Sequence, residues 1–139
     1  MNGTEALVGE WVLGDPEAPV GRTSFEWLEG AKFLIQRWTV DIPGAPDGIA
    51  IIGADGADDT LVQHYFDSRG IARVYRMTLA DNEWTLWRSD DDMSQRFAGT
   101  ISPDGSTITG AWYTGPPNSA ADRTEWTHDF DLVYTKVTT

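Results

Sequence analysis

Several arginines lie inside runs of sequence in which apolar and polar residues alternate. In a β-strand, residues two positions apart point to the same side, so Arg73 shares a side with Tyr75, and Arg88 shares one with Trp84. A guanidinium that points into an enclosed space needs a partner, because burying an unpaired charge is costly. Its planar fork matches a carboxylate, so we expect Arg73 and Arg88 to hold the head group of a ligand.

A third candidate is Arg37, which with Gln36 interrupts an otherwise apolar run at 33–40. A strand that places Arg and Gln beside Phe, Ile and Trp is expected to line a cavity rather than a dry core. The alternative for the strand arginines is cross-strand pairing with carboxylates on the outside of a sheet. The arginines concerned are Arg37, Arg73, Arg76, Arg88 and Arg96, and the candidate carboxylates are Glu26, Asp129 and Asp131.

The chain has only two histidines, and His128 has the more apolar surroundings. Period-two alternation puts His128 on one face with Trp126 and Phe130. This pattern predicts a hydrogen-bonded core histidine, a polar anchor for a ligand or, if haem binds, an axial ligand. The face of His64 is left open. Adjacent strand residues point oppositely, so His128 and Asp129 cannot both face inward, which weakens the simplest acid–base enzyme.

Composition excludes several classes of function. The net charge of −12 and the pI of about 4.3 argue against nucleic acid or an anionic membrane as a partner. Cysteine is absent, and no zinc-protease, calcium-loop, Walker or dinucleotide spacing occurs, so we expect no metal and no cofactor, haem being the alternative. No apolar run reaches membrane-spanning length, and the N-terminus does not resemble a signal peptide, so we expect a cytoplasmic protein.

Ten short runs have the composition of β-strands, and turn signals separate them. The second and third runs flank Glu29-Gly30-Ala31 and predict a β-hairpin. A helical turn is expected within 2–8. Such spacing is typical of an all-β sandwich or barrel, and we favour a single domain over 1–139 that forms a closed, antiparallel, up-and-down barrel of eight to ten strands. The runs cover 10–13, 22–28, 33–40, 49–53, 61–66, 71–79, 83–88, 95–101, 107–114 and 125–136.

Four stretches resemble a known superfamily. The opening Leu7-Val8-Gly9-Glu10-Trp11 resembles the L-x-G-x-W start of calycin-type barrels. The run SFEWLEGAKFLIQRW, together with TITGAW and WTHDFDLVYTKV, is similar to small bacterial lipocalin-like proteins of unknown function. This resemblance implies a lipocalin-like barrel. A more distant resemblance to nitrobindin, a haem-binding barrel, implies His128 as the iron ligand.

We therefore expect the barrel to bind a small apolar or amphipathic molecule, with several of the seven tryptophans around it. The alternatives are an isomerase or cyclase that uses acid–base chemistry in the cavity, and haem binding. The sequence leaves a homodimer open. The candidate ligand contacts are Phe25, Trp27, Arg37, Arg73, Tyr75, Trp84, Arg88, Trp126 and His128.

Overall fold

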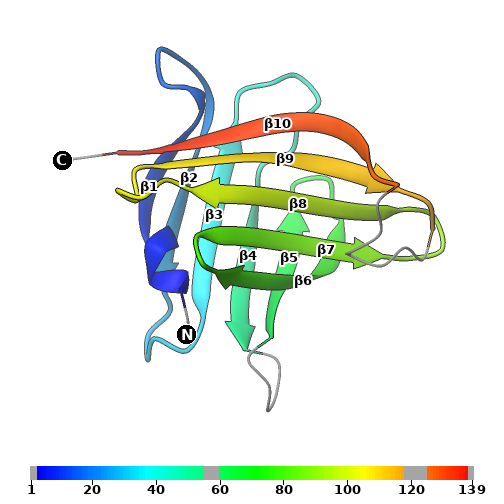
Figure 1. The fold of residues 1–139 in the computed structure, drawn as a ribbon, viewed down its shortest axis with the longest axis horizontal. Helices are drawn as coiled ribbons and strands as arrows, with labels where there is room; N and C mark the ends of the chain where they lie inside the picture. The colour runs from blue at the N-terminus through cyan, green and yellow to red at the C-terminus, as the bar shows by residue number, and fades with distance from the viewer. Residues whose placement is uncertain (1–2, 55–59, 118–124, 138–139) are drawn as a thin grey trace.

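The computed structural model describes residues 3–54, 60–117 and 125–137. In this part of the chain ten strands form one closed antiparallel barrel, in which sequence neighbours pair and the first strand pairs with the last (Figure 1). The predicted closed up-and-down barrel is confirmed. The elements are η1 (Thr4–Leu7), β1 (Gly9–Asp15), β2 (Ala18–Trp27), β3 (Leu34–Val40), β4 (Gly48–Ala54), β5 (Leu61–Asp67), β6 (Ala72–Ala80), β7 (Glu83–Ser89), β8 (Ser94–Ile101), β9 (Thr107–Gly115) and β10 (Thr127–Lys136).

Some expected features lie outside the described residues. They are residue 2 of the expected helical turn and parts of two expected connections between strand runs, at 55–59 and 118–124. The helical turn expected within 2–8 is present as η1, a single turn of 3-10 helix.

The inner face of the barrel follows the alternation of the strands. In β6, for example, Tyr75, Met77 and Leu79 are buried and the residues between them are exposed. Aromatic rings fill the middle of the barrel, where Trp84 packs against Phe97 with ring centroids 4.9 Å apart and against Phe25 at 6.1 Å. These rings supply much of the buried apolar area that offsets the chain entropy lost on folding.

One end of the barrel is closed by η1. Thr4 and Leu7 of this turn are fully buried, and the indole N–H of Trp11 donates to the carbonyl oxygen of Leu7 at 2.8 Å. The opposite end carries the connections at 16–17, 41–47, 68–71 and 90–93. We call it the polar end, because inward-facing charged side chains occur there.

A β-bulge changes the faces in β10. The register with β9 shifts between His128 and Phe130, so that His128 pairs with Tyr113 while Phe130 pairs with Trp112. An extra residue in one strand breaks the period of two, and each side chain before it therefore points to the opposite side. The prediction that His128 shares an inward apolar face with Phe130 is wrong for this reason.

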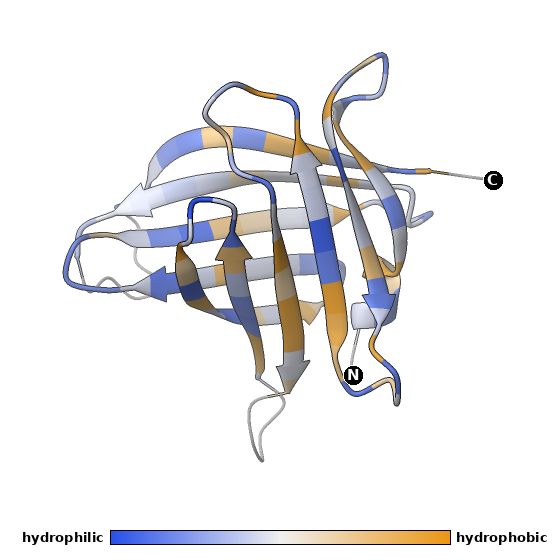
Figure 2. Ribbon diagram, turned by 180° about the vertical axis from the view of Figure 1, so that it is seen from behind, coloured by the Kyte–Doolittle hydropathy of each residue, from blue (hydrophilic) through white to orange (hydrophobic). Residues whose placement is uncertain are grey.

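Apolar residues also occur on the outside of the barrel. Figure 2 shows apolar residues along β4 and β5. Of the large apolar side chains, Ile49, Phe66 and Val74 of β4, β5 and β6 are exposed, as is Phe33, which lies over Gly53 of β4. No helix in the described part of the chain is long and apolar enough to cross a membrane.

The plug made by η1 and Trp11 predicts a large loss of stability when the ring is removed. Replacing Trp11 with Ala leaves a cavity and an unpaired Leu7 carbonyl, so we expect a loss of about 3–5 kcal/mol in the free energy of unfolding. Val12 is the matched control, because it lies next in β1 and only partly buried on the outer face, and Val12→Ala is expected to cost about 1 kcal/mol or less. Urea unfolding followed by far-UV circular dichroism measures both values, and similar losses in the two variants would contradict the plug.

Candidate functional site

Four aromatic rings form a connected row toward the polar end of the barrel. Trp38 stacks on Tyr65 with centroids 5.4 Å apart, Tyr65 meets Tyr75 edge-on at 6.0 Å, and Tyr75 meets Trp112 at 5.7 Å. We call these four residues the aromatic row. Tyr75 is buried, whereas the other three are half-buried and keep part of their surface available.

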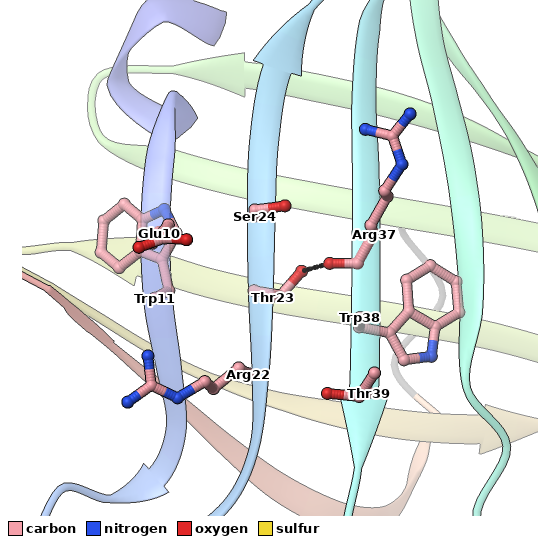
Figure 3. Close-up of a pocket in the computed structure, with 8 residues that line it drawn as sticks. All are labelled: Glu10, Trp11, Arg22, Thr23, Ser24, Arg37, Trp38 and Thr39. Atoms are coloured by element: carbon pink, nitrogen blue, oxygen red, sulfur yellow. Dashed lines mark hydrogen bonds between the residues drawn. The ribbon is translucent and has the colours of Figure 1, made fainter.

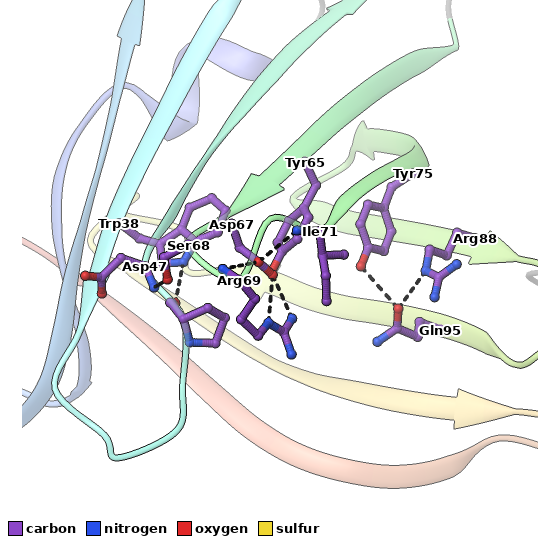
Figure 4. Close-up of polar contacts among 11 residues, drawn as sticks. Trp38, Asp47, Tyr65, Asp67, Ser68, Arg69, Ile71, Tyr75, Arg88 and Gln95 are labelled. Carbon is purple, nitrogen blue, oxygen red and sulfur yellow. Dashed lines mark hydrogen bonds and ion pairs between the residues drawn. The ribbon is translucent and has the colours of Figure 1, made fainter.

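Small residues on β4 explain how rings from β3 and β5 can meet across it. Gly48 pairs with Trp38, and Ala50 pairs with Tyr65. A Cβ atom at Gly48 would lie 2.4 Å from the indole of Trp38 and 2.4 Å from the carbonyl oxygen of Phe66, so only glycine leaves room there. Trp38 is further fixed because its indole N–H donates to the carbonyl oxygen of Pro46 at 3.1 Å (Figure 4).

Arg73 lies beside Tyr65 of the aromatic row. It pairs with Tyr65 across β5 and β6, and its guanidinium carbon lies 5.9 Å from the centre of the Tyr65 ring. The side chain shares the inner face with Tyr75 and is half-buried. No carboxylate in the described part of the chain lies within ion-pair distance of it. Arg73 is therefore a partly desolvated cation whose interaction here is with a ring face.

Arg88, in contrast, is neutralised. Its side chain is 12% exposed and pairs with the Asp90 carboxylate, and its Nε donates to Gln95 Oε1 at 2.7 Å. The Tyr75 hydroxyl donates to the same oxygen at 3.2 Å (Figure 4). The backbone N–H of Met93, and after it the Arg88 guanidinium, hold the pKa of Asp90 well below its usual range. Arg88 thus positions Gln95 and Tyr75 rather than offering a free charge.

Asp67 and Arg69 form a second neutral pair at the rim. Asp67 Oδ2 accepts from Arg69 Nη2 at 2.6 Å and from the Tyr65 hydroxyl at 2.6 Å (Figure 4). Asp67 lies in a rim strand, yet its side chain has no exposed surface because these partners cover it. The Arg69 guanidinium holds the pKa of Asp67 well below its usual range, and burial together with the Asp67 bond raises the pKa of Tyr65 to about 12.

The loop at 41–47 is tied to this rim. The backbone N–H of Ser68 donates to the carbonyl oxygen of Asp47 at 2.8 Å, and the Ser68 hydroxyl accepts from the backbone N–H of Asp47 at 3.2 Å. Asp47 Oδ1 accepts from the backbone N–H of Val40 at 2.8 Å. These bonds hold the rim beside Trp38 in one conformation, which reduces the ordering that ligand binding would need.

The other predicted contacts are divided between core, rim and exterior. Phe25 and Trp84 are buried in the aromatic core, and Trp27 packs against that core near the closed end. They fill the barrel. Trp126 precedes β10 and is half-buried, and its indole N–H has no hydrogen-bond partner among the described residues.

Arg37 and His128 lie outside the barrel, which corrects the prediction that they face inward. In β3 the side chains of Leu34 and Gln36 are buried, so Arg37 points outward and pairs with Glu26. His128 is exposed, with Nε2 2.8 Å from Asp131 Oδ1. The run at 33–40 is apolar on both faces, so its sequence alone did not decide which side faces inward.

Inside the barrel, one polar pair is satisfied and two polar atoms are not. Gln36 Nε2 donates to Thr23 Oγ1 at 3.1 Å, and Thr23 Oγ1 donates to the carbonyl oxygen of Arg37 at 2.9 Å. Gln63 Oε1 and the indole N–H of Trp84 are buried without a partner among the described residues. Buried polar atoms in native proteins are nearly always paired with protein, water or ligand, so the interior has capacity to bind further polar groups.

A groove of about 200 Å³ lies on the outside across β1, β2 and β3 (Figure 3). In it the guanidinium groups of Arg22 and Arg37 extend in different directions, and Arg37 is already paired with Glu26. Charges that diverge do not form an anion site. The groove is therefore a weaker candidate than the aromatic row with Arg73.

Sequence reasoning missed Trp38, Tyr65, Trp112 and Gln95. Each of them belongs to an alternating run in the sequence, yet which of these side chains meet depends on the register between strands, which the alternation does not give.

In the described ranges, 3–54, 60–117 and 125–137, no group of three or more His, Asp or Glu side chains could hold a metal ion. No protein-family model matches the sequence, and no curated protein matches it either.

The rim pair predicts a pH-dependent loss of stability. The pKa of Asp67 is lowered in the folded state, so its contribution is present above the unfolded value of about 3.8 and is lost as the pH falls toward the folded value. We expect Asp67→Asn to melt at a lower temperature than the wild type at pH 7, and the difference to shrink as the pH falls below about 4.

The matched control is Asp41→Asn, which changes an exposed carboxylate at the same end of the barrel. Thermal melts followed by circular dichroism from pH 7 to acid give the comparison. A gap between wild type and Asp67→Asn that stays constant with pH would show that the ion pair does not carry the effect.

Proposed function

We propose that the polar end of the barrel binds a small amphipathic molecule with a planar apolar body and an anionic head. The observation that carries this proposal is Arg73, an inward-facing, half-buried guanidinium without a carboxylate partner in the described part of the chain. Its two neighbours of the same charge, Arg69 and Arg88, are each paired with an aspartate. Arg73 is thus the cation left to meet a ligand.

The chemistry of Arg73 favours a carboxylate or a similar oxyanion. A guanidinium can donate two parallel hydrogen bonds to a carboxylate, and charge-assisted bonds of this kind are stronger in a partly desolvated site. The net charge of −12 repels anions from most of the surface, so the positive charge of Arg73 would determine where an anionic head group binds.

The aromatic row supports an apolar, planar body for the ligand. Three of its rings keep exposed surface, and they present both faces and edges. Barrels of this kind can hold one small ligand at their mouth or interior. The resemblance of Leu7–Trp11 to calycin openings supports the same proposal, since lipocalin-like barrels are expected to bind small molecules.

The geometry favours binding without built-in acid–base chemistry. Both histidines lie on the outer face, and the inward carboxylate of Asp67 is held as an ion by Arg69. A general base must reach a bound substrate, and neither group can do so. The haem alternative does not fit either, because His128 is solvent-exposed beside Asp131 rather than in an apolar pocket.

A pair of probes that differ only in charge tests the role of Arg73. Naphthalene-2-carboxylate and 2-naphthalenemethanol share the planar body, and isothermal titration calorimetry measures their affinities. We expect Arg73→Gln to weaken carboxylate binding about tenfold to a hundredfold, the equivalent of about 1.5–3 kcal/mol for a charged hydrogen bond, and to leave alcohol binding nearly unchanged.

The control is Arg76→Gln on the outer face of the same strand, which is expected to bind both probes like the wild type. Equal losses for both probes in Arg73→Gln would contradict head-group recognition. Failure of the wild-type protein to bind either probe would contradict the proposed function itself.

A further inference from the structure

The outer surface of β4, β5 and β6 carries an apolar patch. Four of the seven exposed large apolar side chains in the described part of the chain lie here, and Val74 is 57% exposed. Contiguous apolar surface of this kind is typical of an interaction site. We call this surface the outer patch, and it consists of Phe33, Ile49, Ile51, Val62, His64, Phe66 and Val74.

Along the paired strands β4 and β5, the outer patch has projecting side chains at one edge and a groove at the other. At one edge Ile49 pairs with Phe66, and both project from the sheet. At the other edge Gly53 pairs with Val62, and the Phe33 ring covers Gly53, where a Cβ atom would come within 2.5 Å of it. Beside this ring lies a groove of about 330 Å³, lined also by Val62, Val74 and Arg76. His64 and Ile51 pair with each other between the two edges.

The charge distribution singles out a second copy of this chain as the occupant. The outer faces of β4, β5 and β6 carry no Asp or Glu, and their only charged or titratable residues are His64 and Arg76. Two copies of net charge −12 repel each other over most of their surface. The outer patch lets two copies approach without placing carboxylates opposite one another.

We propose that two copies associate through the outer patch about a two-fold axis that passes near His64 and Ile51. Such an axis exchanges the two edges, so Phe66 of each copy enters the groove of the other. A two-fold interface must be self-complementary, and a projecting ring beside a hollow on one face meets this requirement. The proposal is independent of the ligand site, which lies on the inside of the barrel.

The size of the outer patch makes this dimer reversible. With strands about 4.8 Å apart and a rise of about 3.3 Å per residue, a patch three strands wide and about seven residues long covers about 330 Å² per copy. Stable interfaces bury about 800 Å² per partner, so we expect a weak dimer that forms at micromolar or higher concentrations.

Sedimentation velocity measures the association directly. The average mass is expected to rise with protein concentration, and to rise further with salt, because screening weakens the repulsion between acidic copies. Val74→Glu places a carboxylate in the patch and is expected to weaken association by about tenfold or more. Thr109→Glu, at an exposed position outside the patch on β9 and opposite uncharged residues, is the matched control and is expected to associate like the wild type.

The absence of cysteine allows a test of the axis itself. Sheets that pack face to face lie about 10 Å apart, so two cysteines beside the axis are within reach of a bismaleimide with a spacer of about 10 Å. His64→Cys is therefore expected to give a covalently linked dimer with this reagent, whereas Thr109→Cys, at an exposed position on β9, is expected to stay unlinked. A wild-type protein that is monomeric at all concentrations and salt levels overturns the proposal. A dimer that persists in Val74→Glu, or equal crosslinking of both cysteine variants, overturns it too.

Discussion

The ladder of hydrogen bonds between β1 and β10 closes the sheet, and this closure determines which side chains can meet. A closed barrel has no free edge, and it divides the residues of each strand between an inside of limited size and an outside. The inside is filled by aromatic rings near its middle and is sealed by η1 at one end. Polar groups that face inward can then reach solvent or a ligand at the opposite end only, which is where Arg73, Arg88 and Asp67 lie.

The balance of charge at that end gives the three arginines different roles. Asp67 and Asp90 compensate Arg69 and Arg88, so these ion pairs cost less to desolvate and fix the rim. Arg73 has a ring face beside it instead of a carboxylate. Arg73 therefore adds no ion pair to the rim, and the proposed ligand recognition rests on this difference between Arg73 and the other two arginines.

Alternation and turn signals were sufficient to predict the ten strands, the antiparallel pairing and the inward faces of Arg73, Tyr75 and Arg88. They failed at His128, because a bulge at Asp129 reverses the alternation and leaves no clear trace in the sequence. They could not orient Arg37, because its run is apolar on both sides. The aromatic row was not predictable either, since Trp38 and Tyr65 meet across β4 only because Gly48 and Ala50 are small.

The central claim, that a ligand binds beside the aromatic row, is tested most directly by nuclear magnetic resonance on ¹⁵N-labelled protein titrated with naphthalene-2-carboxylate. Each tryptophan gives its own indole N–H signal. We predict that the signals of Trp38 and Trp112 shift in a saturable way together with Arg73 Nε–H. The signal of Trp11, sealed at the opposite end, and that of Trp87, on the outer face, should remain in place. Shifts confined to Trp87 and the outer patch, or no shifts at all, would contradict the account.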